Sequence, residues 1–592
     1  MSYYDMNNEE HRLAHGWLIV GLLGCFWIGA FVGVYFGVSP FWAPSPGGLS
    51  RFWFAFWVSA PLGFFGCIPY MALRGILDHR KTQAAAASMA PTSATAASQE
   101  VAQQDLAPKP PEGFKGLKFG VSSGHLYGFE HVGGLPPGTP VFAAKEDCAK
   151  NILILGGIGS GKTTRAINPI LKQLFEQQCG ALVFDIKGDF SREVDFIARQ
   201  TGRSYIKVGV DGLTLNLIRG TTPELAASYL KSCFIASGSA GGNAAFFVDQ
   251  AVELCRQCLT LLTLTGGDYS LAGLYDMVFA DAKREAALDA MVNNGANYDL
   301  RQGRLAESVS NYFDNIHSKF DEKMLSSVNS TVAQVLSPFS HPDLVDAFSG
   351  GETEGEADLT ALLDGAIYFV NLPMTKFGKE GSRYAYMLVK LRFMSLMRER
   401  RTRADWNQKT PVAFVCDEYQ AIIDSITDSD FWDKSRSAGC LGVVSMQGMS
   451  SLYHSVGSRQ AADAIVQNFR QRIIFRTEDE PTMQMAQRLL GQIDVLMVST
   501  SEGSNTSIST SQSMGASASS SKSESGGSSY NESASIQRQQ VFDANDFRGL
   551  ATDYALFVGN VGDRAVDEVI QMQPLFVTDD APVAAQATHA TA

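Results

Sequence analysis

Cysteine and net positive charge are both scarce in this chain. Its nine cysteines are scattered over 592 residues without disulfide-like spacing, which argues against a disulfide-stapled secreted protein and fits a reducing compartment. The formal net charge is -13, so a broad basic surface for nucleic acid is excluded and any such contact has to be local. Cys255 and Cys258 form a CxxC inside an apolar helical run, with no second pair or histidine nearby. We interpret them as packed helix cysteines, because a zinc site needs four ligands.

Charged residues are absent from residues 17–38 and 52–73. Each run is long enough to cross the ~30 Å hydrocarbon core of a bilayer as a helix, and aromatic residues lie near its ends. A cleaved signal peptide is disfavoured because the first run is too long. Positive charges flank the pair rather than separate it, apart from Arg51 at a span edge; they are Arg12, Arg74, Arg80 and Lys81. The sequence therefore predicts a transmembrane hairpin within residues 17–81, with both termini cytoplasmic.

Composition divides the rest of the chain. An Ala/Ser/Pro/Gln-rich stretch is typical of a flexible linker, and a Ser-rich stretch near the C-terminus predicts an exposed loop or linker that interrupts a domain. The expected organisation is a cytoplasmic N-terminus (1–16), the hairpin (17–81), a linker (82–112), the first part of a nucleotide-binding domain (113–220), an all-helical insertion (221–350), the second part of that domain (351–498), the Ser-rich insertion (499–539), a closing part (540–580) and a disordered tail (581–592).

Short apolar runs rich in β-branched residues alternate with helical patterns. Continuous apolar strands separated by helices predict an α/β fold with a mostly parallel sheet covered on both faces. Between 221 and 350 the periodicity is helical instead, which predicts an inserted all-α domain. The expected strands are 151–155, 181–185, 366–372, 411–417, 441–447, 472–477 and 554–560.

A glycine-rich turn follows the first of these strands and opens a helix. It reads GGIGSGKT and fits GxxxxGK[ST] in the strand–turn–helix context that a P-loop requires. Backbone N–H groups and the helix N-terminus favour phosphate oxygens there, Lys162 is expected to reach the β- and γ-phosphates, and Thr163 to ligate Mg²⁺. The predicted nucleotide-binding residues are Gly156, Gly157, Gly159, Ser160, Gly161, Lys162, Thr163 and Thr164.

Two acids end the strand PVAFVCDE. Asp417 is expected to hold Mg²⁺ through water, and Glu418 to orient and deprotonate the attacking water. Such acids could also be a solvated strand end, but the P-loop favours the functional interpretation. The γ-phosphate still needs a cation and a sensor, for which Arg436 and Gln447 are candidates; a surface arginine and a polar strand terminus are the alternatives. Other arginines compete with Arg436, namely Arg470, Arg472 and Arg476.

At these motifs the chain resembles the type IV secretion coupling proteins of the TraG/TraD-like family, the conjugative coupling ATPases. The matching features are the P-loop, the acid pair, Arg436 before the next strand, and Gln447 at its end. The segment Asp185-Ile-Lys-Gly-Asp189 is similar to the family's Asp-Pro-Lys-Gly, but Ile186 replaces proline, which leaves the roles of Asp185 and Lys187 open. The segments 213–220 and 468–491 are also similar.

The resemblance implies a RecA-like P-loop ATPase core that uses ATP and Mg²⁺. It implies that Arg436 is an arginine finger reaching a neighbouring subunit and that Gln447 is the sensor, within a homo-oligomeric ring, expected to be a hexamer. The implied location is the bacterial inner membrane. The implied partners are inner-membrane components of a type IV secretion system, with a relaxase and single-stranded DNA or protein effectors as cargo.

Two alternatives remain at this stage. One is a double-stranded DNA pump of the FtsK/HerA class, although such pumps typically end in a basic winged-helix module and this C-terminus is acidic and Ala-rich. The other is a scaffold that binds ATP without hydrolysis, against which the intact Lys162, Asp417 and Glu418 argue.

Overall fold

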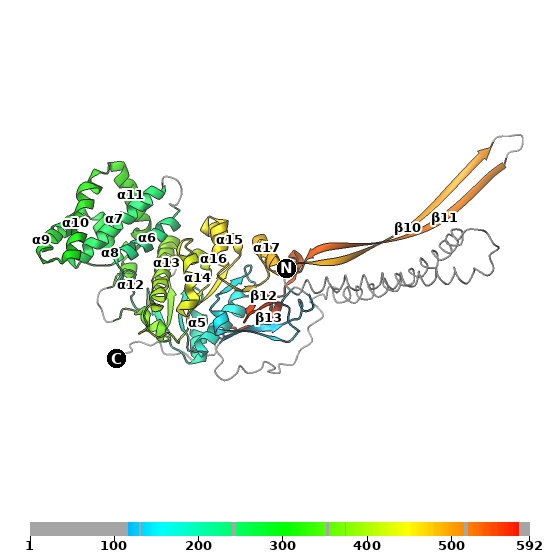
Figure 1. Cartoon of the computed structure of the whole chain (residues 1–592), viewed down its shortest axis with the longest axis horizontal. Helices are drawn as coiled ribbons and strands as arrows, with labels where there is room; N and C mark the ends of the chain where they lie inside the picture. Colours follow the sequence, from blue (N-terminus) through cyan, green and yellow to red (C-terminus); the bar gives the residue numbers. More distant parts are fainter. Residues whose placement is uncertain are drawn as a thin grey trace, which may run out of the picture. The chain divides into compact units, whose positions relative to one another are not determined.

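The structure is a computed structural model that describes residues 116–129, 132–238, 244–350, 355–372, 374–513 and 519–578 (Figure 1). The chain divides into two compact units. The larger comprises Gln104–Val495 and Ile536–Ala592, and the smaller includes Leu496–Ser535.

An 11-stranded sheet organises the larger unit, in the order β2-β1-β13-β12-β9-β3-β8-β7-β4-β6-β5. The strands from β9 to β5 pair in parallel, and β12, β13, β1 and β2 extend the sheet with antiparallel pairs. The parallel strands are β3 (Ile152–Leu155), β4 (Gly180–Asp185), β5 (Ile206–Val208), β6 (Ile367–Asn371), β7 (Val412–Cys416), β8 (Cys440–Met446) and β9 (Gln471–Ile474). The antiparallel strands are β1 (Gly116–Ser122), β2 (Pro140–Ala144), β12 (Tyr554–Val561) and β13 (Arg564–Gln571).

Every strand expected from an apolar run is present, so the prediction of a mostly parallel α/β sheet is confirmed. The prediction was incomplete at both ends of the sheet. At one end β12 pairs antiparallel with β9, and three strands that the sequence pattern missed, β1, β2 and β13, continue the sheet beyond it. At the other end the short strand β5 was also missed.

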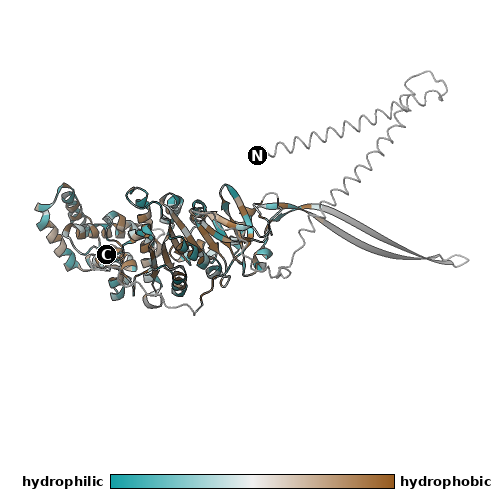
Figure 2. Ribbon diagram, turned by 90° about the horizontal axis from the view of Figure 1, so that it is seen from below, coloured by the Kyte–Doolittle hydropathy of each residue, from teal (hydrophilic) through white to brown (hydrophobic). Residues whose placement is uncertain are grey.

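Helices cover both faces of the sheet. Successive side chains of a strand point to opposite faces, so each strand contributes residues to two cores. In β3, Ile152 and Ile154 pack with α4 (Asn168–Glu176) and α5 (Ser191–Thr201), whereas Leu153 and Leu155 belong to the core on the other face. Figure 2 shows hydrophobic residues along these strands. The core that contains Leu153 and Leu155 also includes residues of five helices, α13 (Met374–Arg400), α14 (Thr427–Lys434), α15 (Met449–Val456), α16 (Arg459–Val466) and α17 (Glu480–Leu490).

A helical domain is inserted between β5 and β6, as predicted. Its helices lie at one end of the larger unit, away from β12 and β13 (Figure 1). The long helix α7 (Ala244–Thr265) contacts α6 (Pro223–Ala236), α8 (Leu271–Phe279), α9 (Asp281–Asn294), α10 (Leu300–Asn315) and α11 (Glu322–Leu336), and α12 (Pro342–Phe348) closes the domain. Cys255 and Cys258 are buried in α7, which fits packed helix cysteines.

The Ser-rich segment is not a loop. It contains two long strands, β10 (Gln492–Ser513) and β11 (Ser519–Gln540), which form a two-stranded sheet of their own. The expectation of a loop rested on the lack of apolar residues. Backbone hydrogen bonds between two strands need no apolar side chains, so composition did not reveal them.

The predicted membrane location needs correction. In the part of the chain that the structure describes, no helix is both long enough and apolar enough to cross a bilayer. The two expected spans, residues 17–38 and 52–73, lie outside the described residues. The prediction of an inner-membrane protein with two spans is therefore contradicted.

A buried ion pair fixes the segment that follows β7. Lys390 of α13 donates from Nζ to both carboxylate oxygens of Asp428, at 2.7 and 2.9 Å, and to the carbonyl of Ile422 at 2.6 Å. Both charged side chains are fully buried, and burial raises the pKa of Asp428 despite the opposing charge of Lys390. The hydroxyl of Tyr419 donates to the same carboxylate at 2.7 Å and accepts from the indole N–H of Trp432 at 2.8 Å.

A second contact ties this segment to the helical domain. Arg383 of α13 donates from Nε to the carbonyl of Ala421 and from Nη1 to the carbonyl of Ala236, each at 3.0 Å. Ala236 is the last residue of α6, and Ala421 lies three residues after Glu418. One arginine thus joins the insertion to the loop after β7.

We predict that Lys390→Met lowers the free energy of unfolding by about 3–5 kcal/mol, because Asp428 is left as an unpaired buried charge. Urea denaturation followed by circular dichroism measures this. The matched control is Lys434→Met, whose ion pair with Asp430 is half exposed on both sides and should be worth about 1 kcal/mol or less. Equal losses of unfolding free energy in the two variants would contradict the stabilising role of the Lys390–Asp428 ion pair.

Candidate functional site

The glycine turn after β3 leads directly into a helix. Residues Thr163–Ile167 form a π-helical turn, η1, that continues into α4. Gly159 and Gly161 have φ of 71° and 92°, which residues with a side chain rarely adopt. A Cβ on Gly156 would lie 2.7 Å from both Cβ of Phe475 and Oγ of Ser160. The sequence signature of a phosphate-binding turn is therefore matched by the backbone that such a turn needs.

Two polar groups inside this turn are suited to an anion. Lys162 is buried, and its Nζ donates to the carbonyls of Gly156 and Gly157 at 2.6 and 3.1 Å. Burial lowers the pKa of Lys162, and Asp417 and Glu418 act in the opposite direction. The hydroxyl of Ser160 is buried and has no hydrogen-bond partner among the residues that the structure describes. Phosphate oxygens would accept hydrogen bonds from both the buried hydroxyl and the buried ammonium. These residues therefore fit a nucleotide phosphate.

The acid pair lies at the end of β7, as predicted. Asp417 and Glu418 are 9% and 7% exposed, and Oδ1 of Asp417 accepts from the N–H of Glu418 at 3.0 Å. Glu418 has a φ of 58°, an uncommon conformation for a residue with a side chain. This geometry turns the chain sharply after β7 and leads into the segment that the Lys390–Asp428 pair holds.

The order of the strands brings these motifs together. β8 lies between β3 and β7 and is parallel to both, so the carboxyl ends of the three strands share one edge. Gln447 directly follows β8, and its Nε2 donates to Oε2 of Glu418 at 3.3 Å. Gln420 donates to the same oxygen. The structure thus places Lys162, the acid pair and Gln447 at one site.

Arg436 lies at the opposite edge. It belongs to η7 (Ser435–Ala438), which precedes β8, and its side chain is exposed and makes no ion pair with any residue that the structure describes. The flanking residues are firmly held. The side chain of Asn151 donates to Oγ of Ser435 at 3.1 Å, and buried Arg400 donates to the carbonyl of Ala438 at 3.2 Å. The exposed side chain of Arg436 therefore extends from a turn that hydrogen bonds hold in place on both sides.

The three other candidate arginines lie in different places. Arg470 is exposed just before β9, at the same edge as Arg436. Arg472 lies within β9, where burial and the charge of Arg470 lower its pKa to about 10. Arg476 follows β9 and is exposed beside the glycine turn, where its carbonyl accepts from Gly157 at 3.0 Å.

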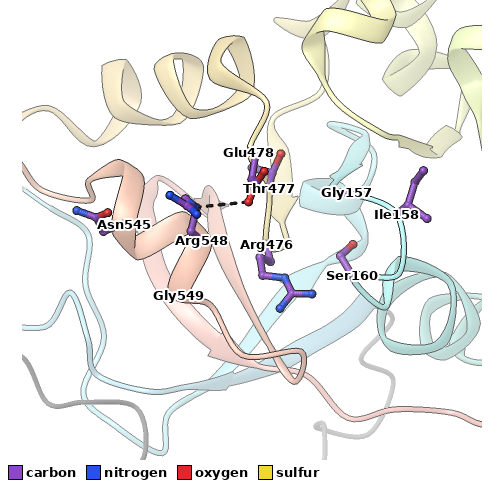
Figure 3. Close-up of a pocket in the computed structure, with 9 residues that line it drawn as sticks. All are labelled: Gly157, Ile158, Ser160, Arg476, Thr477, Glu478, Asn545, Arg548 and Gly549. Atoms are coloured by element: carbon purple, nitrogen blue, oxygen red, sulfur yellow. Dashed lines mark ion pairs between the residues drawn. The ribbon is translucent and has the colours of Figure 1, made fainter.

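A cavity of about 630 Å³ opens on the β9 side of the glycine turn (Figure 3). It lies between the turn, the segment after β9 and the short helix α18 (Ala544–Gly549). Arg548 of α18 and Glu478 form an ion pair across it, 3.5 Å apart. The lining residues are Gly157, Ile158, Ser160, Arg476, Thr477, Glu478, Asn545, Arg548 and Gly549.

One part of the site was not assigned from sequence. Asp185 ends β4, and its carboxylate accepts from the N–H groups of Gly188, Asp189 and Phe190 at 2.7, 3.2 and 3.1 Å. The turn that results carries Lys187 to the acid pair. The similarity of this segment to a family motif was the available signal, but its partners lie more than 200 residues away in the chain.

We predict that Asp185→Ala lowers the free energy of unfolding by about 1–3 kcal/mol, because three backbone N–H groups lose their acceptor. Asp185→Asn keeps one carbonyl oxygen and should lose less. Chemical denaturation of both variants measures the difference. Asp189→Ala, an exposed neighbour in the same turn, is the control, and it should stay close to wild type. If it loses as much stability as Asp185→Ala, the turn is not organised by Asp185.

Known families match two segments of the chain. Residues 137–201 match a model described as the type IV secretion-system coupling protein DNA-binding domain, and residues 411–551 match the TraM recognition site of TraD and TraG. These segments contain the glycine turn, Lys187, the acid pair, Arg436 and Gln447. No curated protein sequence matches the chain.

Solved structures share the fold. The bacterial conjugative coupling protein TrwBdeltaN70, in an unbound monoclinic form, has 14% identity and a TM-score of 0.51 over 76% of this chain and 89% of that one. Its trigonal form in complex with sulphate has 14% identity and a TM-score of 0.50 over 78% and 94%. The two matched family models support a type IV secretion coupling protein, and the solved structures show the fold that this chain shares with such proteins.

Proposed function

We propose that this chain is an ATPase that recruits cargo to a type IV secretion or conjugation machine and drives its translocation by ATP hydrolysis. The cargo is a relaxase bound to single-stranded DNA, protein effectors, or both. The observation that carries the proposal is the convergence of the glycine turn around Lys162 with Asp417, Glu418 and Gln447 at one sheet edge.

The residues at this edge of the sheet have different roles in hydrolysis. The glycine turn and Lys162 hold the β- and γ-phosphates, and the adjoining cavity leaves room for the rest of the nucleotide. Thr163 and Asp417 would hold Mg²⁺, which when bound would neutralise charge on the phosphate oxygens. No group of three His, Cys, Asp or Glu side chains suited to a metal occurs among the described residues, so the ion would depend on the nucleotide's own oxygens.

Glu418 takes the proton of the attacking water, and Gln447 holds its carboxylate in position. The hydrogen bond from Gln447 to Oε2 restricts how the carboxylate turns, and Oε1 is ion-paired with Lys187. Placement of the base at the edge that holds the phosphates gives it access to water beside the γ-phosphate.

Arg436 acts on the nucleotide of a neighbouring subunit. β8 has seven residues and separates Arg436 from Gln447, a distance of about 23 Å at ~3.3 Å per residue. An arginine side chain is far shorter, so Arg436 cannot serve the site of its own subunit. A head-to-tail ring, which we take to be a hexamer, would place this edge of one copy against the nucleotide edge of the next.

ATP turnover of Glu418→Gln tests the proposal. Loss of the general base should slow turnover by about 10²–10⁴-fold while nucleotide binding persists. Lys162→Ala should instead abolish binding, because the phosphates lose their buried cation. Steady-state phosphate release and fluorescent-nucleotide titration separate the two effects. Turnover of Glu418→Gln equal to that of wild type would favour a scaffold that binds ATP without hydrolysing it.

Arg436→Ala should leave nucleotide binding nearly intact and slow turnover by ~10³-fold or more, as loss of a trans arginine finger does. Arg470→Ala, an exposed arginine at the same edge, is the matched control. Mixing Arg436→Ala with Lys162→Ala should recover part of the activity, since a Lys162→Ala subunit can lend its arginine to an intact neighbouring site. Absence of recovery, or an equal loss in Arg470→Ala, would refute the assignment.

A further inference from the structure

Lys187 places a cation between the two acids of the site. Its Nζ lies 2.7 Å from Oε1 of Glu418 and 3.2 Å from Oδ2 of Asp417. Among the described residues, no other lysine or arginine is ion-paired with either acid. The carboxylate side chains are 11% and 9% exposed, so little water is available to separate their negative charges, and Lys187 neutralises part of that charge.

The surrounding structure favours this position for Lys187. β4 and β7 are neighbours in the sheet, with Phe184 opposite Cys416, so the turn after β4 lies beside the acids after β7. Gly188, at a φ of 85°, and the carboxylate of Asp185 shape that turn. Burial lowers the pKa of Lys187, but the two acids outweigh burial and the net pKa is raised.

Lys187 is also able to move away from the two acids. Its side chain is 42% exposed, whereas Lys162 is buried. Lys162 and Lys187 are close enough for Lys187 to lower the pKa of Lys162. A divalent cation and Lys187 would therefore compete for the carboxylate of Asp417 under mutual repulsion.

We propose that Lys187 holds Asp417 and Glu418 in the nucleotide-free protein, at the place that the divalent cation takes, and that the two cations compete. Lys187 is then a positioning residue that keeps the acids ordered until the metal–nucleotide complex displaces it. This rests on the proposed function, because the metal arrives with the nucleotide.

Lys187→Met, Lys187→Arg and a control, Lys172→Met, test the competition. Lys172 pairs with Glu176 on the surface of α4, so its variant loses the same charge and one ion pair away from the site. Fluorescent ADP is titrated at increasing Mg²⁺. The half-saturating Mg²⁺ concentration should fall about threefold in Lys187→Met, since a half-exposed pair is a modest competitor, and should stay near wild type in Lys187→Arg and Lys172→Met.

A second readout needs no nucleotide. Without metal, Lys187→Met should melt about 1–3 °C below wild type, because two adjacent carboxylates lose their counter-ion. Lys187→Arg should melt like wild type.

An unchanged half-saturating Mg²⁺ concentration in Lys187→Met would reduce Lys187 to a structural ion pair, and a raised one would show that it assists the metal; either result overturns the proposal. Failure of wild type to bind ADP would instead refute the proposed function. The melting measurement would then decide alone, and a Lys187→Met protein that melts like wild type would refute the inference as well.

Discussion

Parallel pairing of β3, β8, β7 and β4 is the constraint on which the site depends. Parallel strands end at a common edge, so motifs that are far apart in the chain meet there once the strand order is set. The glycine turn, Gln447, the acid pair and the turn at Asp185 each begin where one of these strands ends. The same pairing sends the residues before each strand, Arg436 among them, to the other edge.

Much of this edge could be predicted from sequence because its strands are buried on both faces. Such strands are continuous apolar runs, and NILIL before a glycine turn and PVAFVC before two acids are recognisable in isolation. The antiparallel end of the sheet offered weaker signals. β1 contains glycines and β13 mixes charged with apolar residues, and the direction in which β12 pairs depends on partners that its own residues do not reveal.

The contacts of the site could not be predicted to the same extent. Lys187 was named from sequence without a role, since its partners follow 230 residues later and only the order of β4 and β7 brings them near. Asn151 and Arg400, which anchor the turn that carries Arg436, bear no pattern that distinguishes them from other polar residues. The Ser-rich strands were missed because composition describes segments one at a time and not how they pair.

The hydrogen bonds of Arg383 connect the helical insertion to the loop that follows the acid pair. The carbonyls of Ala236 and Ala421 share one guanidinium, so a displacement of α6 either strains the loop after Glu418 or breaks a hydrogen bond. Lys390 and Asp428 hold that loop stiffly, which leaves it little freedom to absorb the strain locally. A load applied to the insertion would therefore be transmitted to the backbone that follows Glu418.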